Sequence, residues 1–325
     1  MTEPIKPLSE VMGSLSENYG RYYGLLDFQT AQLDGSGLFS PRRFSRKAWI
    51  FSGLVTEKYI TGFAVVDAGV VATAFCYVQD RTTGAYLEEK AVKPYGFPEE
   101  FSPTLKNTWK IQDGRKIWKY EPFGDSFKFE YLGKDFSLHF TMKENENGIS
   151  TIAPSEGRPF HFTYKNMNLE TNATLSLGNK EIQFDGNIGV LDFSKGYPPR
   201  ETFWNWASFV GITSSGHEFA LNLTAIFNDG LENIYWLDKK PYPVGKATFT
   251  YEKPISENKT IIKDDSGLLE LEFSPEGKRS EKLDALILKS NFTQAFGRFK
   301  GKIIHGGEEI LVSGSGLVEE HYALW

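Results

Sequence analysis

The sequence predicts an all-β protein of antiparallel hairpins, and three observations support this fold class. Aromatic residues make up 15% of the 325 residues, including 26 Phe and 15 Tyr, and aromatic side chains favour strands. Short runs rich in Val, Ile, Phe, Tyr and Thr recur along the chain. Turn dipeptides such as Asp113-Gly114 and Asn147-Gly148 separate these runs, and no long amphipathic helix intervenes, so a parallel α/β sheet is not expected.

The expected elements follow one another simply along the chain. Residues 5–18 are compatible with a short N-terminal helix, because Ser9 and Glu10 lie near its start and Gly20 follows its end. Strands are then expected at 47–55, 59–69, 70–80, 108–112, 115–121, 126–132 and 136–142. Residues 300–305 and 308–314 are expected to pair as a hairpin around Gly306-Gly307.

The segment from Asp192 to Asp238 combines three of the seven Trp residues with unusually polar neighbours. Period-two alternation puts Trp204 and Trp206 on one face of a strand and Phe203, Ala207 and Phe209 on the other. On the next strand, Phe219, Leu221, Leu223 and Phe227 form an apolar row opposite Ala220, Asn222, Thr224 and Ile226. Large aromatics beside sparse polar groups predict the wall of a small-molecule pocket. The candidate ligand-binding residues are Trp49, Trp204, Trp206, Asn222, Asn233 and Trp236.

Charged residues accompany this aromatic segment and are the candidates for chemistry. Asp192 and Glu232 are candidate catalytic acids, because a carboxylic acid kept protonated by apolar surroundings can act as a general acid. The alternative is architectural: Arg200 could clamp Asp192 or Glu232 across a strand end, and Lys165 lies upstream as a further partner. Lys165 and Arg200 are therefore expected to form structural ion pairs.

A faint internal repeat suggests two related β domains. The stretch that starts at Trp49 resembles the stretch that starts at Trp204, an offset of 155 residues (204 minus 49). Similarity this weak also arises between unrelated β-meanders, so both explanations stay open. We place the expected division after residue 172, which gives domains 1–172 and 173–325.

Several functional classes lose support from the sequence. The net charge of −6 and the interspersed charges leave no basic stripe for nucleic acid. No run approaches the roughly 18 apolar residues of a membrane helix, and no apolar signal segment opens the chain, so we expect a cytoplasmic protein. Phosphate-loop, zinc-protease and serine-hydrolase motifs are absent and the five His are scattered, so we expect no metal or nucleotide cofactor. The sequence leaves the oligomeric state open.

The second half of the chain carries a specific set of residues: Thr163, Lys165, Asp192, Gly196, Arg200, Trp204, Trp206, Asn222, Glu232, Asn233, Trp236, Gly316, Glu319 and Trp325. In this combination the second half resembles the bacterial domain-of-unknown-function family 2804. The first half matches more weakly, mainly through Trp49 and the strands after it.

The family is in turn distantly similar to the carotenoid hydratase (hydroxyneurosporene synthase) and AttH-like group. This resemblance implies two lipocalin-like (calycin-like) antiparallel β-barrel or sandwich domains and a lipophilic ligand of isoprenoid or polyketide-like character. It implies acid-catalysed olefin hydration or cyclisation. Because the family itself has no assigned activity, the residue roles are our own assignment: Asp192 or Glu232 as the proton donor, and Trp204, Trp206 and Trp236 sheltering a cation. Two alternatives are a non-catalytic lipophile carrier with the same cavity and a structural protein whose tryptophans fill a solid core.

Overall fold

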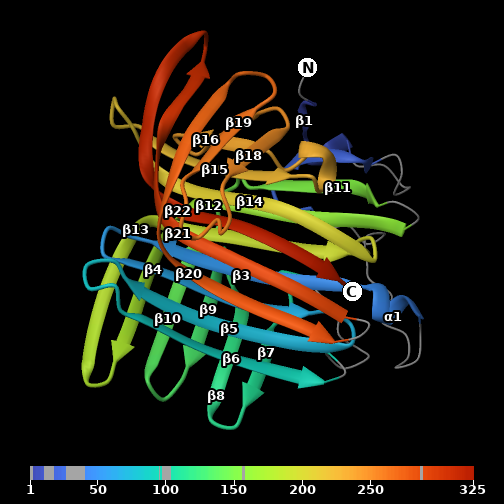
Figure 1. Ribbon diagram of the computed structural model, residues 1–325, viewed down its shortest axis with the longest axis vertical. Coiled ribbons are helices and arrows are strands. Elements are labelled where there is room, and N and C mark those ends of the chain that lie inside the picture. The colour runs from blue at the N-terminus through green and yellow to red at the C-terminus, as the bar shows by residue number, and fades with distance from the viewer. Residues whose placement is uncertain are drawn as a thin grey trace.

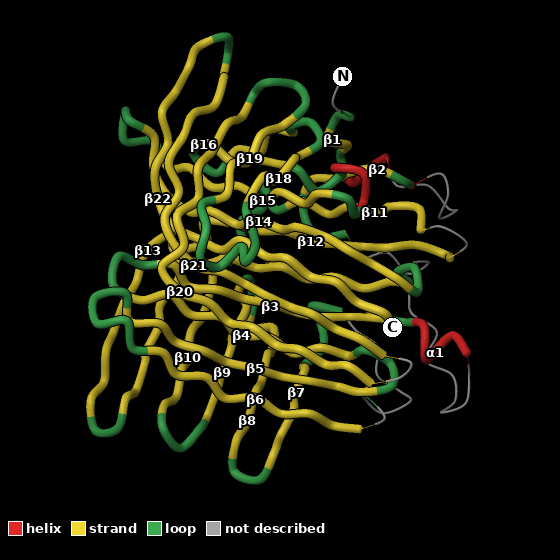
Figure 2. The backbone as a smooth tube through the Cα atoms, viewed as in Figure 1, coloured by secondary structure: helices red, strands yellow, loops and turns green. Residues whose placement is uncertain are grey.

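The computed structural model describes residues 3–10, 18–26, 41–94, 96, 104–155, 158–285 and 288–325. This part of the chain is almost entirely strand, and its few helical segments are short (Figure 2). Strands β3–β10 curl around one end of the molecule and β14–β19 around the other, with the long strands β20, β21 and β22 crossing between them (Figure 1). The predicted fold class is confirmed.

The first sheet contains thirteen of the described strands and is antiparallel except where β1 pairs with β2. Its strands are β1 (Ile5–Lys6), β2 (Gly20–Tyr23), β3 (Lys47–Val55), β4 (Tyr59–Asp67), β5 (Val71–Asp80), β6 (Tyr86–Pro94), β7 (Trp109–Asp113), β8 (Lys116–Phe123), β9 (Ser126–Leu132), β10 (Phe136–Lys143), β11 (Ile149–Ser155), β12 (Arg158–Leu177) and β13 (Lys180–Gly196).

The second sheet contains nine of the described strands and is antiparallel throughout. Its strands are β14 (Glu201–Thr213), β15 (Glu218–Ala225), β16 (Ile234–Leu237), β17 (Lys240–Pro243), β18 (Ala247–Tyr251), β19 (Thr260–Asp264), β20 (Leu269–Ala285), β21 (Leu288–His305) and β22 (Glu308–Leu324). The described helical segments are η1 (Leu8–Glu10), α1 (Pro41–Ser45) and η4 (Asn228–Gly230).

The two sheets repeat one strand order. The main path of the first reads β6-β5-β4-β3-β13-β12-β10-β9-β8-β7, and the second reads β17-β16-β15-β14-β22-β21-β20-β19-β18. In both, four consecutive strands run outward to one edge, and the first of the four pairs with a later strand, β13 or β22. Trp49 on β3 and Trp204 on β14 therefore occupy equivalent places, which supports the repeat that the sequence suggested.

Three separate clusters of apolar side chains fill the molecule. The first sheet curls around one, which includes Phe63 and Trp118, and the second sheet curls around another, which includes Phe209 and Phe273. A third cluster lies where the outer faces of the sheets meet, and Trp236 is fully buried in it. The interiors of both curled sheets are packed with side chains, so any ligand site has to lie elsewhere.

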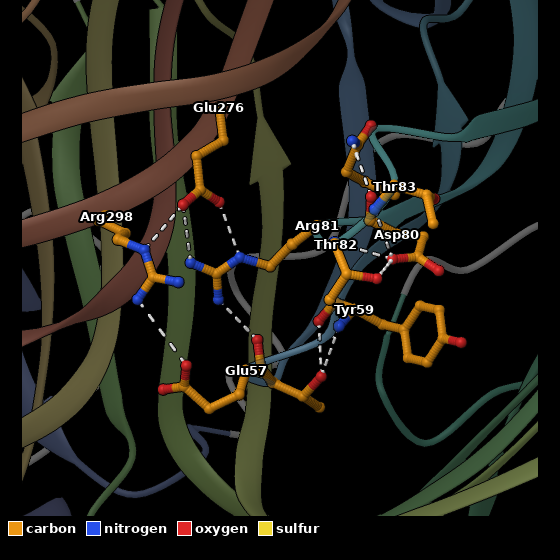
Figure 3. Close-up of polar contacts among 10 residues, drawn as sticks. Glu57, Tyr59, Asp80, Arg81, Thr82, Thr83, Glu276 and Arg298 are labelled. Atoms are coloured by element: carbon orange, nitrogen blue, oxygen red, sulfur yellow. Dashed lines mark hydrogen bonds and ion pairs between the residues drawn. The ribbon is translucent and has the colours of Figure 1, made fainter.

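A polar network also joins the sheets (Figure 3). Arg81, which follows β5, makes two hydrogen bonds to the carboxylate of Glu276 on β20, of 2.7 and 3.2 Å. Arg298 on β21 binds the same carboxylate at 2.9 Å and lies 3.7 Å from Glu57 in the turn between β3 and β4. The Arg81 side chain is only 2% exposed and that of Glu276 27%, and the bidentate geometry fixes how the two side chains meet.

The short N-terminal helix expected from the sequence differs from the structure. In the described part of residues 5–18 the chain forms β1 and η1, with Ile5 and Lys6 paired to Arg21 and Tyr22, and residues 11–17 lie outside the described residues. The domain division after residue 172 stays a prediction; that position lies within β12, and the chain passes from the first sheet to the second between β13 and β14.

Candidate functional site

A cavity of about 250 Å³ lies between the two sheets, outside both curled interiors. Its lining side chains alternate along β3, β4, β5, β12 and β13 of the first sheet and β14, β15, β20, β21 and β22 of the second. On most of these strands they share one face, because side chains two residues apart point the same way. At the start of β21 and the end of β22, Lys289 and Leu324 from the other face also reach the cavity. The other face of the same strands fills the interior clusters, so one alternating pattern builds both a core and a cavity wall.

Aromatic rings from equivalent strands meet across this cavity. The indoles of Trp49 and Trp204 stack with an interplanar angle of 8° and centroids 6.4 Å apart. Phe51 meets Trp206 edge-on, with centroids 5.7 Å apart. Phe227 packs against Trp204 at 5.8 Å. These rings give the cavity a mainly apolar wall whose faces can attract positive charge.

Lys165 joins two carboxylates in the wall. Its Nζ lies 2.5 Å from Oδ1 of Asp192, its direct neighbour across the β12–β13 ladder, and 3.1 Å from Oε2 of Glu232. Glu232 follows η4 in the second sheet, so the pairing crosses between the sheets, and Asn228 and Thr224 also donate to Glu232. Burial disfavours the charge on Lys165, but the two carboxylates outweigh it and raise the pKa of the ammonium group.

Glu319 on β22 is a buried acid opposite the aromatic wall. The indole N–H of Trp204 donates to its Oε1 at 2.8 Å, and Nε2 of Gln294 donates to its Oε2 at 3.1 Å. Burial raises the pKa of this carboxyl group to about 7, although both hydrogen bonds act to lower it. The charge of Asp192 raises it further and that of Lys165 lowers it. Glu319 can therefore hold or release a proton at neutral pH.

Two histidines also line the cavity, one from each sheet. Burial is the main cause that lowers the pKa of His161 and of His321 to about 3. Nε2 of His321 lies 2.9 Å from the hydroxyl of Ser290, and its ring meets Trp204 edge-on at 4.3 Å. Both imidazoles are therefore neutral at pH 7 and contribute shape and hydrogen bonding, not charge.

Six of the ten site residues expected from the sequence meet in the cavity lining, although 183 positions separate the first from the last. They are Trp49, Lys165, Asp192, Trp204, Trp206 and Glu232. The other four lie outside the lining, in supporting or distant positions. They are Arg200, Asn222, Asn233 and Trp236.

Asn222 and Asn233 support the wall from behind. Asn222 accepts from the indole N–H of Trp206 at 2.7 Å and donates to the carbonyl oxygen of Glu232 at 2.9 Å. Asn233 accepts from the backbone N–H of Thr224 at 2.7 Å. Both amides are buried and hold lining residues in place without contacting the cavity themselves.

Trp236 and Arg200 serve elsewhere. Trp236 is part of the cluster between the sheets, where its indole N–H donates to the carbonyl oxygen of Asn147 at 2.9 Å. Arg200 was expected to clamp Asp192 or Glu232. Arg200 comes directly before the first residue of β14, where it is exposed. There it donates to the carbonyl oxygen of Trp325 and not to either acid.

Glu319, Gln294 and Phe227 were not expected in the site. Phe227 was placed in the interior row of β15, but that strand ends at Ala225 and Ile226 has a positive φ of 74°, which interrupts the alternation. Glu319 lies on the same face of β22 as the buried Leu317, two residues before it. A carboxyl group on the apolar face of a strand was the signal that could have found it.

The described residues can also be compared with the requirements of a metal site and of a membrane-spanning helix. Within them, no three His, Cys, Asp or Glu side chains are arranged to hold a metal ion. No helix in the described ranges is long and apolar enough to span a membrane.

Comparison with known proteins shows the family and the fold. A family model described as a domain of unknown function (DUF2804) matches residues 5–325. The chain belongs to the DUF2804 family. No curated protein matches this DUF2804 chain significantly.

Two solved structures share the fold of the DUF2804 chain. A protein from Nitrosomonas europaea assigned as an AttH has 15% identity and a TM-score of 0.54, over 86% of this chain and 93% of that one. Kievitone hydratase from Nectria haematococca has 14% identity and a TM-score of 0.56, over 94% of this chain and 98% of that one. At such identities the likeness shows the fold alone, the predicted pair of lipocalin-like domains.

Proposed function

We propose that the cavity binds a lipophilic small molecule of isoprenoid or polyketide-like character and that the protein catalyses hydration or cyclisation of an olefin in it. The observation that carries this proposal is a carboxyl group, Glu319, buried in a tryptophan-walled cavity. Because its pKa is raised to about 7, part of the population is protonated at neutral pH, as a general acid requires.

The cavity wall suits such a ligand in both size and polarity. Its volume of about 250 Å³ lies just below the roughly 300–1,000 Å³ of most ligand pockets, so it fits a compact ligand or one end of a longer one. Trp49, Trp204 and Trp206 supply apolar contact, and polar groups gather around Lys165 and Glu319. Such a division favours a molecule with an apolar body and few polar groups.

In hydration, Glu319 gives its proton to one olefin carbon, and the other carbon becomes a cation. The faces of Trp49 and Trp204 and the carboxylates Asp192 and Glu232 stabilise that charge. Water adds to the cation through its oxygen, and the proton that it then loses returns to Glu319. In cyclisation, a second double bond of the ligand attacks instead of water, and the proton finally lost returns to the same carboxylate.

Fold likeness adds support to hydration, because one of the two similar structures is named a hydratase. The ion pairs of Lys165 suggest that the three acids have different roles. Asp192 and Glu232 are both held by one ammonium group, which suits them to stabilise positive charge. Glu319 binds the neutral donors Trp204 and Gln294, which leaves it better suited to give up a proton.

Ligand capture tests the proposal first. The purified protein is extracted with organic solvent, the extract is analysed by mass spectrometry, and the thermal shift caused by terpenoids is measured. We expect a co-purifying lipophile or a stabilising terpenoid. An empty extract together with no thermal shift would contradict lipophile binding.

Turnover of the captured ligand in isotope-labelled water tests the chemistry. We expect a hydration product to gain the labelled oxygen and a cyclisation product to form without it, and we expect Glu319→Gln to lower either turnover by about 100-fold or more. Glu320→Gln is the matched control, since Glu320 points to the other face of β22 and bonds with Tyr251. Asp192→Asn and Glu232→Gln should cause smaller losses.

A carrier without chemistry is the second candidate. The observation that favours it is that Lys165 pairs with both Asp192 and Glu232, as in a purely architectural ion cluster. A carrier would release its ligand unchanged in labelled water, and Glu319→Gln would alter affinity without altering any product. The labelled-water experiment therefore separates the two candidates.

A further inference from the structure

Three hydrogen-bonded side chains, Tyr77, Gln294 and Glu319, link the two sheets beside the cavity, and the last two line it. The hydroxyl of Tyr77 on β5 donates to Oε1 of Gln294 on β21 at 2.6 Å. Nε2 of Gln294 then donates to Oε2 of Glu319 on β22 at 3.1 Å. Tyr77 belongs to the first sheet and Gln294 and Glu319 belong to the second. We call this hydrogen-bonded series Tyr77–Gln294–Glu319 the relay; it crosses the interface between the sheets and ends on the buried acid.

Packing holds the Tyr77 ring in place. Gly62 lies directly opposite Tyr77 on β4, and a Cβ at position 62 would lie 2.3 Å from a ring carbon of Tyr77. The ring therefore lies against bare backbone, where any larger residue would displace it. Phe296 of the second sheet stacks on the ring, with centroids 5.7 Å apart. The hydroxyl is thus directed across the interface at Gln294.

Donor and acceptor roles in the relay follow from the chemistry of its groups. Burial is the largest cause that raises the pKa of the Tyr77 phenol, so the hydroxyl keeps its proton and can donate it. A side-chain amide offers an oxygen acceptor at one end and N–H donors at the other. With its oxygen engaged by Tyr77, Gln294 presents N–H to Glu319, and that end favours an ionised carboxylate.

We propose that Tyr77 is a positioning residue for Glu319: its hydroxyl holds the Gln294 amide with the N–H end toward the carboxyl group. Without this hydroxyl the amide is free to turn and offer its oxygen to a protonated Glu319. The inference deepens the proposed function, since it rests on Glu319 as the proton donor. Its test needs no ligand.

Infrared titration of Tyr77→Phe tests the inference. The carbonyl band of protonated Glu319 is assigned by its absence in Glu319→Gln and followed with pH in the unliganded protein. In Tyr77→Phe we expect the titration midpoint to rise by about one pH unit, a tenfold change in proton affinity. An unchanged or lower midpoint overturns the inference.

Two controls separate positioning from a general loosening of the interface. Tyr86→Phe removes the hydroxyl of a neighbouring ring, which stacks on Phe296 and bonds with Glu88, and it should leave the midpoint unchanged. In a Gln294→Leu background, Tyr77→Phe should cause no further shift, because the relay is already broken. An equal shift in Tyr86→Phe, or an additive one in the Leu background, overturns the inference.

Failure of this inference can be told apart from failure of the proposed function. Failure of the titration to respond to Tyr77→Phe leaves lipophile capture and labelled-water turnover as they were. An empty extract contradicts the proposed function and does not alter the midpoint.

Discussion

The pairs Asp192–Lys165 and Glu319–Gln294 occupy equivalent places in the two sheets and differ in charge. In the first sheet the order is β3-β13-β12, and Asp192 on β13 lies opposite Lys165 on β12. In the second sheet the equivalent order is β14-β22-β21, and Glu319 on β22 lies opposite Gln294 on β21. Both acids face the same cavity from opposite sides.

The partner, more than the position, separates the two acids chemically. Lys165 offers an ammonium group, which forms ion pairs with Asp192 and with Glu232 from the other sheet. Gln294 offers only a neutral N–H, which cannot offset the burial that raises the pKa of Glu319 to about 7. A repeated architecture thus places two similar acids symmetrically, one beside an ammonium group and the other beside a neutral amide, and burial raises the pKa of the acid beside the amide.

Removing the ammonium group should produce the largest effect. Lys165→Met leaves the buried Asp192 and Glu232 without the cation that pairs with both. Breaking a buried ion pair on one side costs about 3–5 kcal/mol, because charge is left uncompensated. We expect that loss in the free energy of unfolding, measured by chemical denaturation at pH 7.

The matched change in the other pair is Gln294→Leu. It removes a neutral donor from an acid that can take up a proton instead of staying charged, so the expected loss is smaller, about 1–3 kcal/mol. Equal losses in Lys165→Met and Gln294→Leu would contradict the distinction between a charged and a neutral partner.

The pH dependence of stability should show the next largest effect. Folding raises the pKa of Glu319 from 4.5 to about 7, so the folded state binds this proton more tightly than the unfolded chain. The stabilisation is therefore complete below about pH 4.5 and is lost as the pH rises through about 7. The change corresponds to about 3 kcal/mol.

Glu319→Gln should remove this dependence, since an amide does not titrate in this range. We expect the difference in the free energy of unfolding between the wild type and Glu319→Gln to change by about 3 kcal/mol between pH 4.5 and 8. Glu320→Gln should keep the wild-type profile. A constant difference between the wild type and Glu319→Gln would show that Glu319 titrates normally.

The sequence could predict the fold class because its signals are local. Alternation within one strand placed Trp204 and Trp206 on the face opposite Ala207 and Phe209, and the structure confirms this division between cavity and core. Turn dipeptides marked the hairpins for the same reason: glycine accepts the positive φ found at Gly114 and other turns.

The contacts within the site could not be predicted in this way. Lys165 meets Glu232 only because two curled sheets pack face to face, and no pattern within either segment encodes that packing. Trp236 shows the converse problem. It was predicted to bind the ligand, but the packing of the two sheets buries its ring in the cluster between them, outside the cavity lining.

The smallest effect should come from converting the second pair into the first. Gln294→Lys places an ammonium group opposite Glu319, where the equivalent residue of the first sheet is Lys165. A cation beside a carboxyl group favours its ionised form and lowers its pKa by about one to three pH units. The infrared band of protonated Glu319, which is strong near pH 6.5 in the wild type, should therefore be at least about threefold weaker at that pH.

Thr293→Lys supplies the matched control for added charge. It introduces the same ammonium group on the other face of β21, opposite Glu320 on β22, where it cannot reach the cavity. We expect the Glu319 titration to stay near pH 7 in this variant. If both lysines lowered the midpoint equally, overall charge would account for the shift. If neither did, the protonation of Glu319 would depend on burial alone, and the partner across the strand would not be what separates the two acids.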